Sequence, residues 1–179
     1  MTRNFSPSTI DVIGDITNGI GVATGVFANL TYFHQDQWEL FHVYGRVLLK
    51  RLFIECITDN GAGATLIQFN YTFTTPAITV KPMCAVSGSI AAVPRGARFV
   101  WVGGAVATAC VITVATGGFS DVVNTNPAIL GGEGFIGTVG MLTTTADAAS
   151  GTSQAFAYYV PMSDGAYMEA NALPTTPPG

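Results

Sequence analysis

Charged residues are scarce in this sequence. They make up 10% of its 179 residues, compared with roughly 25% in ordinary globular domains. Lysine and arginine together number 7 and the net charge is −4, so the chain lacks the clustered basic residues that nucleic-acid binding requires. The surface must consist largely of small polar and apolar residues, and such a surface is tolerable where other subunits cover much of it.

Histidine is nearly absent, which limits the chemistry available to the chain. Only His34 and His42 could act as the base in nucleophilic catalysis, and neither has Cys, Asp or Glu neighbours at metal-ligand spacing. The glycine-rich segment 19–25 misses the dinucleotide-binding spacing, and phosphate-loop and nucleophile-elbow motifs are missing. We therefore expect no enzyme activity and no catalytic, cofactor-binding or metal-binding residues. A pair of carboxylates brought together by the fold stays a distant alternative.

Cysteine is also scarce, and its pattern argues against a disulfide framework. Cys56, Cys84 and Cys110 are three in number, lie in no CxxC spacing and have apolar neighbours. We predict buried, reduced thiols, which favours synthesis in a reducing cytoplasm. The first ten residues lack the apolar segment of a secretory signal, and this favours the same compartment.

What the sequence does contain is uncharged runs rich in β-branched residues. The run 99–116, FVWVGGAVATACVITVAT, is interrupted once, by Gly103-Gly104. Its length alone would also suit a membrane-spanning helix. β-Branched residues favour strands, however, and Gly-Gly between two such runs indicates a hairpin. We therefore predict two strands joined by a tight turn, and no membrane segment.

Short strands separated by turn residues recur from residue 38 onwards. The alternation changes parity between Leu49 and Leu52, which predicts a β-bulge or a corner between two sheets. Further strands are expected at 64–73, at 77–86 with Pro82 marking an edge or bend, at 135–142 and at 154–162. About eight to ten such strands predict an all-β domain over residues 37–170, either an antiparallel β-sandwich or a jelly-roll-like barrel.

The two ends of the chain differ from this body. Residues 1–36 are rich in Gly, Asn and Thr, and we predict an extended arm in which 10–16 and 21–33 could each form a short strand. Residues 171–179 are predicted to form an extended, proline-rich tail. The apolar residues of the arm need a surface to cover, which a neighbouring subunit would provide. These candidate interface residues are Ile10, Val12, Ile13, Val22, Val26, Phe27, Leu30 and Phe33.

Two short motifs give the chain a resemblance to a group of known proteins. Residues 40–48 read LF-x-V-x-G-x-V-L, and residues 161–166 read P-x-x-D-G-A after an aromatic strand. Together with the Val/Thr/Ala/Gly-rich body between them, these motifs resemble tailed-bacteriophage virion proteins. The resemblance covers residues 40–170, leaves the arm outside, and does not extend to Lys50-Arg51. It implies a structural component of the virion head without catalytic residues.

We therefore expect a capsid decoration or cement protein at the surface of a phage head. Its expected partners are the major capsid protein and further copies of itself, with no nucleic acid and no membrane. A tail or fibre component is the alternative in the same setting. A carbohydrate-binding adhesin is the alternative of another class, because exposed aromatics could form a sugar-stacking platform, although aromatics alternate onto a β core as readily. The candidate aromatics are Trp38, Trp101, Tyr158, Tyr159 and Tyr167.

Overall fold

A computed structural model describes residues 24–30, 38–61, 66–73, 78–104, 106–114, 126–132, 136–143 and 151–171. In these residues it contains strands β1 to β11 and no helix, which confirms the predicted all-β class. A search of the same residues for helices long and apolar enough to cross a membrane finds none.

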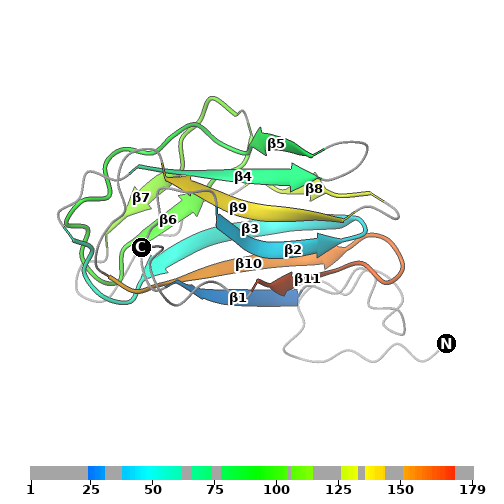
Figure 1. The fold of residues 1–179 in the computed structure, drawn as a ribbon, viewed down its shortest axis with the longest axis horizontal. Coiled ribbons are helices and arrows are strands. Elements are labelled where there is room, and N and C mark those ends of the chain that lie inside the picture. Colours follow the sequence, from blue (N-terminus) through cyan, green and yellow to red (C-terminus); the bar gives the residue numbers. More distant parts are fainter. Residues whose placement is uncertain are drawn as a thin grey trace.

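Two antiparallel sheets form the fold, and they face each other across the core (Figure 1). Sheet 1 has the order β1 (Thr24–Leu30), β10 (Ser153–Pro161), β3 (Val47–Cys56), β6 (Arg98–Trp101) and β7 (Val111–Thr113), and β8 (Ala128–Leu130) pairs with the start of β3. Sheet 2 has the order β11 (Tyr167–Ala170), β2 (Trp38–Tyr44), β9 (Ile136–Thr143), β4 (Ile67–Phe73) and β5 (Thr79–Pro82). Of the two predicted architectures, the described strands form the sandwich, and they do not close into a barrel.

The chain crosses from sheet 2 to sheet 1 between β2 and β3. Gly45 has a φ of 70°, in the left-handed region that favours glycine, and the crossing takes only Gly45 and Arg46. A bulge follows within β3, because Tyr158 of β10 is opposite Arg51 while Tyr159 is opposite Leu49. Lys50 is the extra residue of this bulge. Of the two features that the change of parity predicted, the bulge is present at Lys50. The corner between the sheets lies five residues earlier, at Gly45.

The run 99–116 does contain an antiparallel hairpin, but its turn differs from the prediction. Phe99 of β6 is opposite Ile112 of β7, and the connection spans residues 102–110 instead of two glycines. Gly103 has a φ of 70° and lies against the carbonyl oxygen of Asn126, where a Cβ would collide. The Asn126 amide in turn donates to the Val102 carbonyl at 2.7 Å. The glycines thus serve a close approach of another segment, and the tight-turn prediction is wrong.

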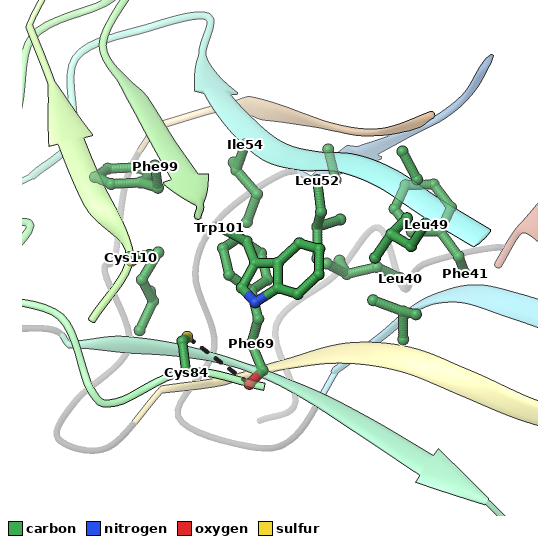
Figure 2. Packing of buried hydrophobic residues seen from close by; sticks show 14 of the residues in the cluster. Leu40, Phe41, Leu49, Leu52, Ile54, Phe69, Cys84, Phe99, Trp101 and Cys110 are labelled. Carbon is green, nitrogen blue, oxygen red and sulfur yellow. Dashed lines mark hydrogen bonds between the residues drawn. The ribbon is translucent and has the colours of Figure 1, made fainter. Parts of the chain in front are cut away.

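Large apolar side chains from both sheets fill the space between them (Figure 2). Trp101 lies at the centre of this core, and its indole nitrogen donates to the Met83 carbonyl at 3.0 Å, so its one polar atom is satisfied. The largest fully buried side chains are Phe41, Phe69, Phe99, Leu40, Leu49, Leu52, Ile54, Ile67 and Ile90.

All three cysteines belong to the same core and are buried as free thiols. Burial raises the pKa of the Cys56 thiol to about 11 and that of the Cys110 thiol to about 12. The Cys84 sulfur lies 4.0 Å from the Phe69 carbonyl, and burial raises its pKa as well. The prediction that these residues act as small buried hydrophobes is confirmed.

Part of the predicted arm belongs to the domain itself. Residues 24–30 form β1, which pairs with β10 of the same chain in continuous register from Thr24 opposite Tyr159 to Leu30 opposite Ser153. The short strand predicted within 21–33 is therefore present at 24–30, where it completes an edge of sheet 1 in its own chain. The rest of the arm and the tail from residue 172 lie outside the described residues.

Candidate interaction surface

The side of sheet 1 that faces away from the core is unusually apolar. Leu52 and Ile54 of β3 point into the core, so strand alternation places Arg51, Phe53 and Glu55 on the opposite side. We call this side the outer face of sheet 1. In a sandwich such a face is normally lined with polar residues, because it meets solvent.

A row of five apolar residues crosses the outer face from one edge of the sheet to the other. The strand register aligns one residue from each of five strands, namely Phe27, Phe156, Phe53, Val100 and Val111. Phe53 and Phe156 stack with ring centres 4.9 Å apart, and Phe27 lies tilted 6.2 Å beyond Phe156. Phe27 at the edge is 56% exposed, whereas Phe53 in the middle is only 8% exposed. Neighbouring side chains therefore cover the centre of the row and leave its β1 end open.

Tyr158 lies beside this row and adds to it. Its ring centre is 6.4 Å from that of Phe53 and nearly parallel to it, at 14°. The ring also lies over Gly25, because a Cβ built at Gly25 would be 3.1 Å from the Tyr158 ring. Gly25 thus leaves room for an aromatic ring at the sheet edge, where Tyr158 is exposed.

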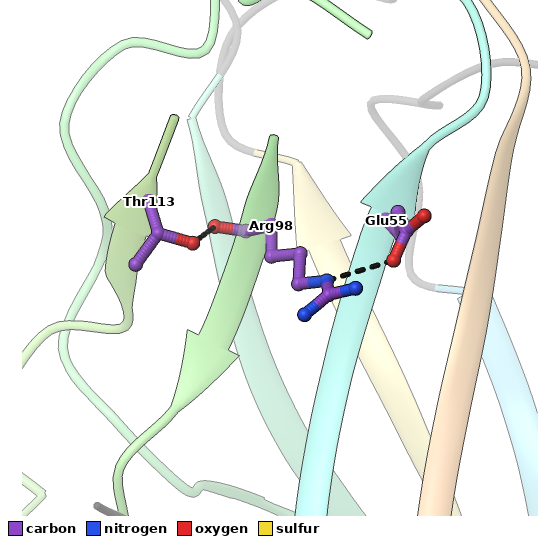
Figure 3. A network of polar contacts seen from close by, with 3 residues as sticks. All are labelled: Glu55, Arg98 and Thr113. Atoms are coloured by element: carbon purple, nitrogen blue, oxygen red, sulfur yellow. Dashed lines mark hydrogen bonds and ion pairs between the residues drawn. The ribbon is translucent and has the colours of Figure 1, made fainter. Parts of the chain in front are cut away.

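Two arginines cover the middle of the row from opposite sides. The guanidinium carbons of Arg51 and Arg98 each lie 5.5 Å from the centre of the Phe53 ring. Arg98 Nε donates to Glu55 Oε2 at 2.7 Å, and the Arg98 carbonyl accepts the Thr113 hydroxyl (Figure 3). Arg51 Nε is buried, and the described part of the chain offers it no hydrogen-bond partner. Arginine beside aromatic rings is the composition typical of energetically dominant residues in protein interfaces.

The apolar character continues on the other side of the bulge. There the register aligns Val160 with Leu48 and Leu48 with Ile129, and Ile129 is 60% exposed. Among the residues of β3 and β6, basic side chains outnumber acidic ones, with Lys50, Arg51 and Arg98 against Glu55, although the chain as a whole carries −4. The outer face of sheet 1 therefore combines apolar side chains with a local excess of basic residues on β3 and β6.

The far side of sheet 2 has a different character. Its register aligns Glu169, His42, Thr138 and Thr72 in a polar row. Tyr44 donates its hydroxyl to Glu169 Oε1 at 2.8 Å and stacks on Tyr167 with ring centres 4.5 Å apart. The hydrogen bond to the Glu169 carboxylate, with a smaller effect of burial, raises the pKa of Tyr44. This small aromatic and acidic patch is the second candidate site.

Reactive groups do not gather in the part of the chain that the structure describes. His42 lies on the solvent side of β2, because its neighbours Phe41 and Val43 are both buried in the core. It therefore lies on the opposite face of sheet 2 from the core thiols. Within the described ranges, no three residues among His, Cys, Asp and Glu are arranged to hold a metal ion.

The residues predicted as an interface are only partly placed. Val26 packs against the core from β1, Phe27 is exposed at the edge of the outer face, and Leu30 ends β1. Five more predicted residues lie outside the described residues, namely Ile10, Val12, Ile13, Val22 and Phe33.

The aromatics considered for a sugar platform separate in the fold. Trp101 and Tyr159 are buried in the core, while Tyr158 and Tyr167 are exposed on different sheets. Trp38 begins β2. Trp101, Tyr158, Tyr159 and Tyr167 therefore do not form one sugar-binding platform.

Sequence reasoning missed the outer face itself. A usable signal was present in Leu52-Phe53-Ile54, since three consecutive apolar residues in a strand must place at least one on each face.

Comparisons of the chain with protein-family models, curated proteins and solved structures find no match.

Proposed function

We propose that this protein is a structural virion protein that decorates a phage head and stabilises the shell by binding between or across its subunits. The major capsid protein is its proposed partner. The observation that carries the proposal is the outer face of sheet 1, where two apolar rows and two arginines lie on a surface that a free sandwich would make polar. Exposed large apolar side chains grouped on one face, here Phe27, Tyr158 and Ile129, are typical of interaction sites.

The proposed mechanism is mechanical. Covering exposed side chains such as Phe27, Tyr158 and Ile129 removes apolar area from water, which stabilises a contact by about 25 cal/mol per Å². Arg51 is only partly buried, so a carboxylate of the partner could pair with the accessible part of its guanidinium group. Repetition of one modest contact over a lattice strengthens attachment through multivalency. The virion setting is supported by the motifs in residues 40–48 and 161–166.

Particles that lack the protein provide the test. They should assemble, yet lose their contents sooner on heating or osmotic shock, and added purified protein should restore their stability. A triple variant, Phe27→Ser with Tyr158→Ser and Ile129→Ser, should fail to restore it. Tyr167→Ser is the matched control, because Tyr167 is as exposed as Tyr158, at 44%, but lies on sheet 2. Equal stability of particles with and without the protein would contradict the proposal, and labelling of the tail instead of the head would favour the tail alternative.

Glycan binding is a second candidate function, and one observation favours it. Tyr44 and Tyr167 stack beside the Glu169 carboxylate, which combines a ring face with a hydrogen-bond acceptor, as sugar recognition requires. If this patch binds glycans, Tyr167→Ser should abolish adsorption of particles to cells and leave particle stability unchanged. Adsorption of particles carrying Tyr167→Ser therefore separates the two functions, because a decoration protein predicts unchanged adsorption and glycan binding predicts its loss.

A further inference from the structure

Strand β1 forms an edge of sheet 1 and lacks the features that usually protect an edge. Its seven residues, TGVFANL, include no charge and no proline. The other edge strands in the described part of the chain are all blunted. β5 ends in Lys81-Pro82, β11 has four residues including Glu169, and β7 and β8 have three residues each. A long, uncharged edge pairs readily with another chain unless something covers it.

The β1 edge is open over at least its first half. Thr24, Gly25 and Phe27 are all exposed, and although β11 of sheet 2 lies close to β1, these three residues stay accessible to solvent. Along its length β1 pairs with β10 on one side, and among the described strands none pairs with it on the other. The Phe27 end of the apolar row is therefore also its open end.

We infer that β1 binds β1 of a second copy of this chain, antiparallel and about a two-fold axis at Phe27. Phe27 is the central residue of β1, so the axis places it opposite Phe27 of the second copy. Position 25 is then opposite position 29, and position 24 opposite position 30. This register keeps the outer faces of the two copies on the same side, and the row Phe53, Phe156, Phe27 continues into the second copy.

A second copy suits this edge better than a charged partner does. Because β1 carries no charge, two copies bring no like charges together at the contact, although each chain carries −4. The pairing is short, and we expect a weak dimer in dilute solution, since it buries less area than a standard interface. The inference is independent of the proposed function, because it concerns only contacts between copies of this chain.

Disulfide trapping tests the register directly. Residues directly opposite in antiparallel strands have Cα atoms about 4.5–5.5 Å apart, which lies within the range that a disulfide spans. Phe27→Cys, oxidised by glutathione disulfide, should therefore form a covalent dimer, with two thiols joined and two glutathione molecules released. The wild type is the background control, because its three cysteines are buried.

Two further variants distinguish specific pairing from random collision. Ile129→Cys is matched in exposure, at 60% against 56% for Phe27, and should give roughly tenfold less dimer. Asn29 lies two positions further along the same strand. Asn29→Cys should also give little covalent dimer, since position 29 of one copy is opposite position 25 of the other. Equal dimer from Phe27→Cys and Ile129→Cys, or more from Asn29→Cys, overturns the inference.

A non-covalent measurement gives an independent answer. In sedimentation equilibrium at high protein concentration, the wild type should associate reversibly, and Phe27→Lys should weaken association by roughly tenfold or more because it opposes two like charges. Ile129→Lys should leave association unchanged. A wild type that stays monomeric at every concentration contradicts the inference, and assigns the edge to another segment of the chain or a different protein.

Discussion

Arg51 and Arg98 hold their guanidinium groups at the same distance, 5.5 Å, from the Phe53 ring, but only Arg98 also binds a carboxylate. The pair with Glu55 is about one-third exposed, so it adds little to the free energy of unfolding. Arg51 keeps a buried Nε for which the described residues provide no acceptor. Arg98 is thus engaged by an acidic side chain of its own sheet, whereas Arg51 is the arginine assigned to docking in the proposed function.

Exchange of each arginine for methionine should reveal this difference. Arg51→Met keeps an apolar stem over Phe53 and removes a buried Nε that has no acceptor among the described residues, so the free energy of unfolding should change by less than about 0.5 kcal/mol. Arg98→Met removes the ion pair and should lower the free energy of unfolding by about 0–1 kcal/mol. Urea unfolding measures both. On particles lacking the protein, Arg51→Met should weaken binding roughly tenfold, and Arg98→Met should weaken it less. Equal losses would argue against a docking role for Arg51.

Alanine at three glycines should separate backbone strain from crowding at the corner between the sheets. Gly45 and Gly165 have φ values of 70° and 68°, but a Cβ would lie 3.0 Å from the Ala166 Cβ at Gly45 and meets nothing within 4 Å at Gly165. Gly165→Ala should cost about 1–2 kcal/mol from strain alone. Gly45→Ala should cost roughly 1 kcal/mol more, because the neighbouring chain must also move. Gly88→Ala is the control and should be nearly neutral, since its site is open.

Stability should fall in alkaline solution because of the buried thiols. Burial raises the pKa of Cys56 from its ordinary value of 9.0 to about 11, and that of Cys110 to about 12. The unfolded chain releases these protons from about pH 9, while the folded chain retains them, so their contribution is complete below pH 9 and is lost as the pH rises toward 11–12.

Urea titrations between pH 8 and pH 11 would measure this loss. The free energy of unfolding should decline above about pH 9, and Cys110→Ala should decline less steeply. Burial raises the pKa of Tyr71 too, which acts in the same direction, so Tyr71→Phe is a second control. A pH dependence unchanged by Cys110→Ala would show that this thiol ionises alike in both states.

The parts of the fold that sequence reasoning captured are those fixed by local chemistry. Runs of β-branched residues predicted the strands, and the change of parity after Leu49 predicted the bulge. Pro82 correctly indicated an edge strand at β5, because proline has no backbone N–H to donate to a neighbouring strand. The corner at Gly45 was missed, since Val43 and Val47 keep the same alternation on both sides of it. Alternation reports which face of a strand is apolar, but not which sheet the strand joins.

The outer face was missed for a non-local reason. Phe27, Phe53 and Phe156 become neighbours only through the register of β1, β3 and β10, which are far apart in the sequence. Each phenylalanine alone fits a core position equally well. Pattern reasoning placed Phe27 at an interface because it lay in the segment that looked least like a core. The structure gives that residue a different context, as the open end of an aromatic row.

Removal of the N-terminal segment in two steps should separate its two roles. Deletion of residues 1–23 leaves β1 intact, so the domain should fold with its free energy of unfolding nearly unchanged. Deletion of residues 1–30 removes β1 and exposes the edge of β10, the Tyr158 ring and the Val26 side of the core. Loss of the Val26 side chain from the core and of the β1 ladder should cost roughly 2–4 kcal/mol, measured by urea unfolding.

Attachment to particles provides the second readout of these deletions. If the predicted arm binds a neighbouring subunit, the chain without residues 1–23 should fold normally and attach more weakly to particles lacking the protein. Phe27→Ser in the full-length chain is the matched control, because it alters the outer face and keeps the arm. Normal attachment after deletion of residues 1–23 would restrict the interface to the outer face of sheet 1. Failure of that shorter deletion to fold would instead assign residues 1–23 to the domain.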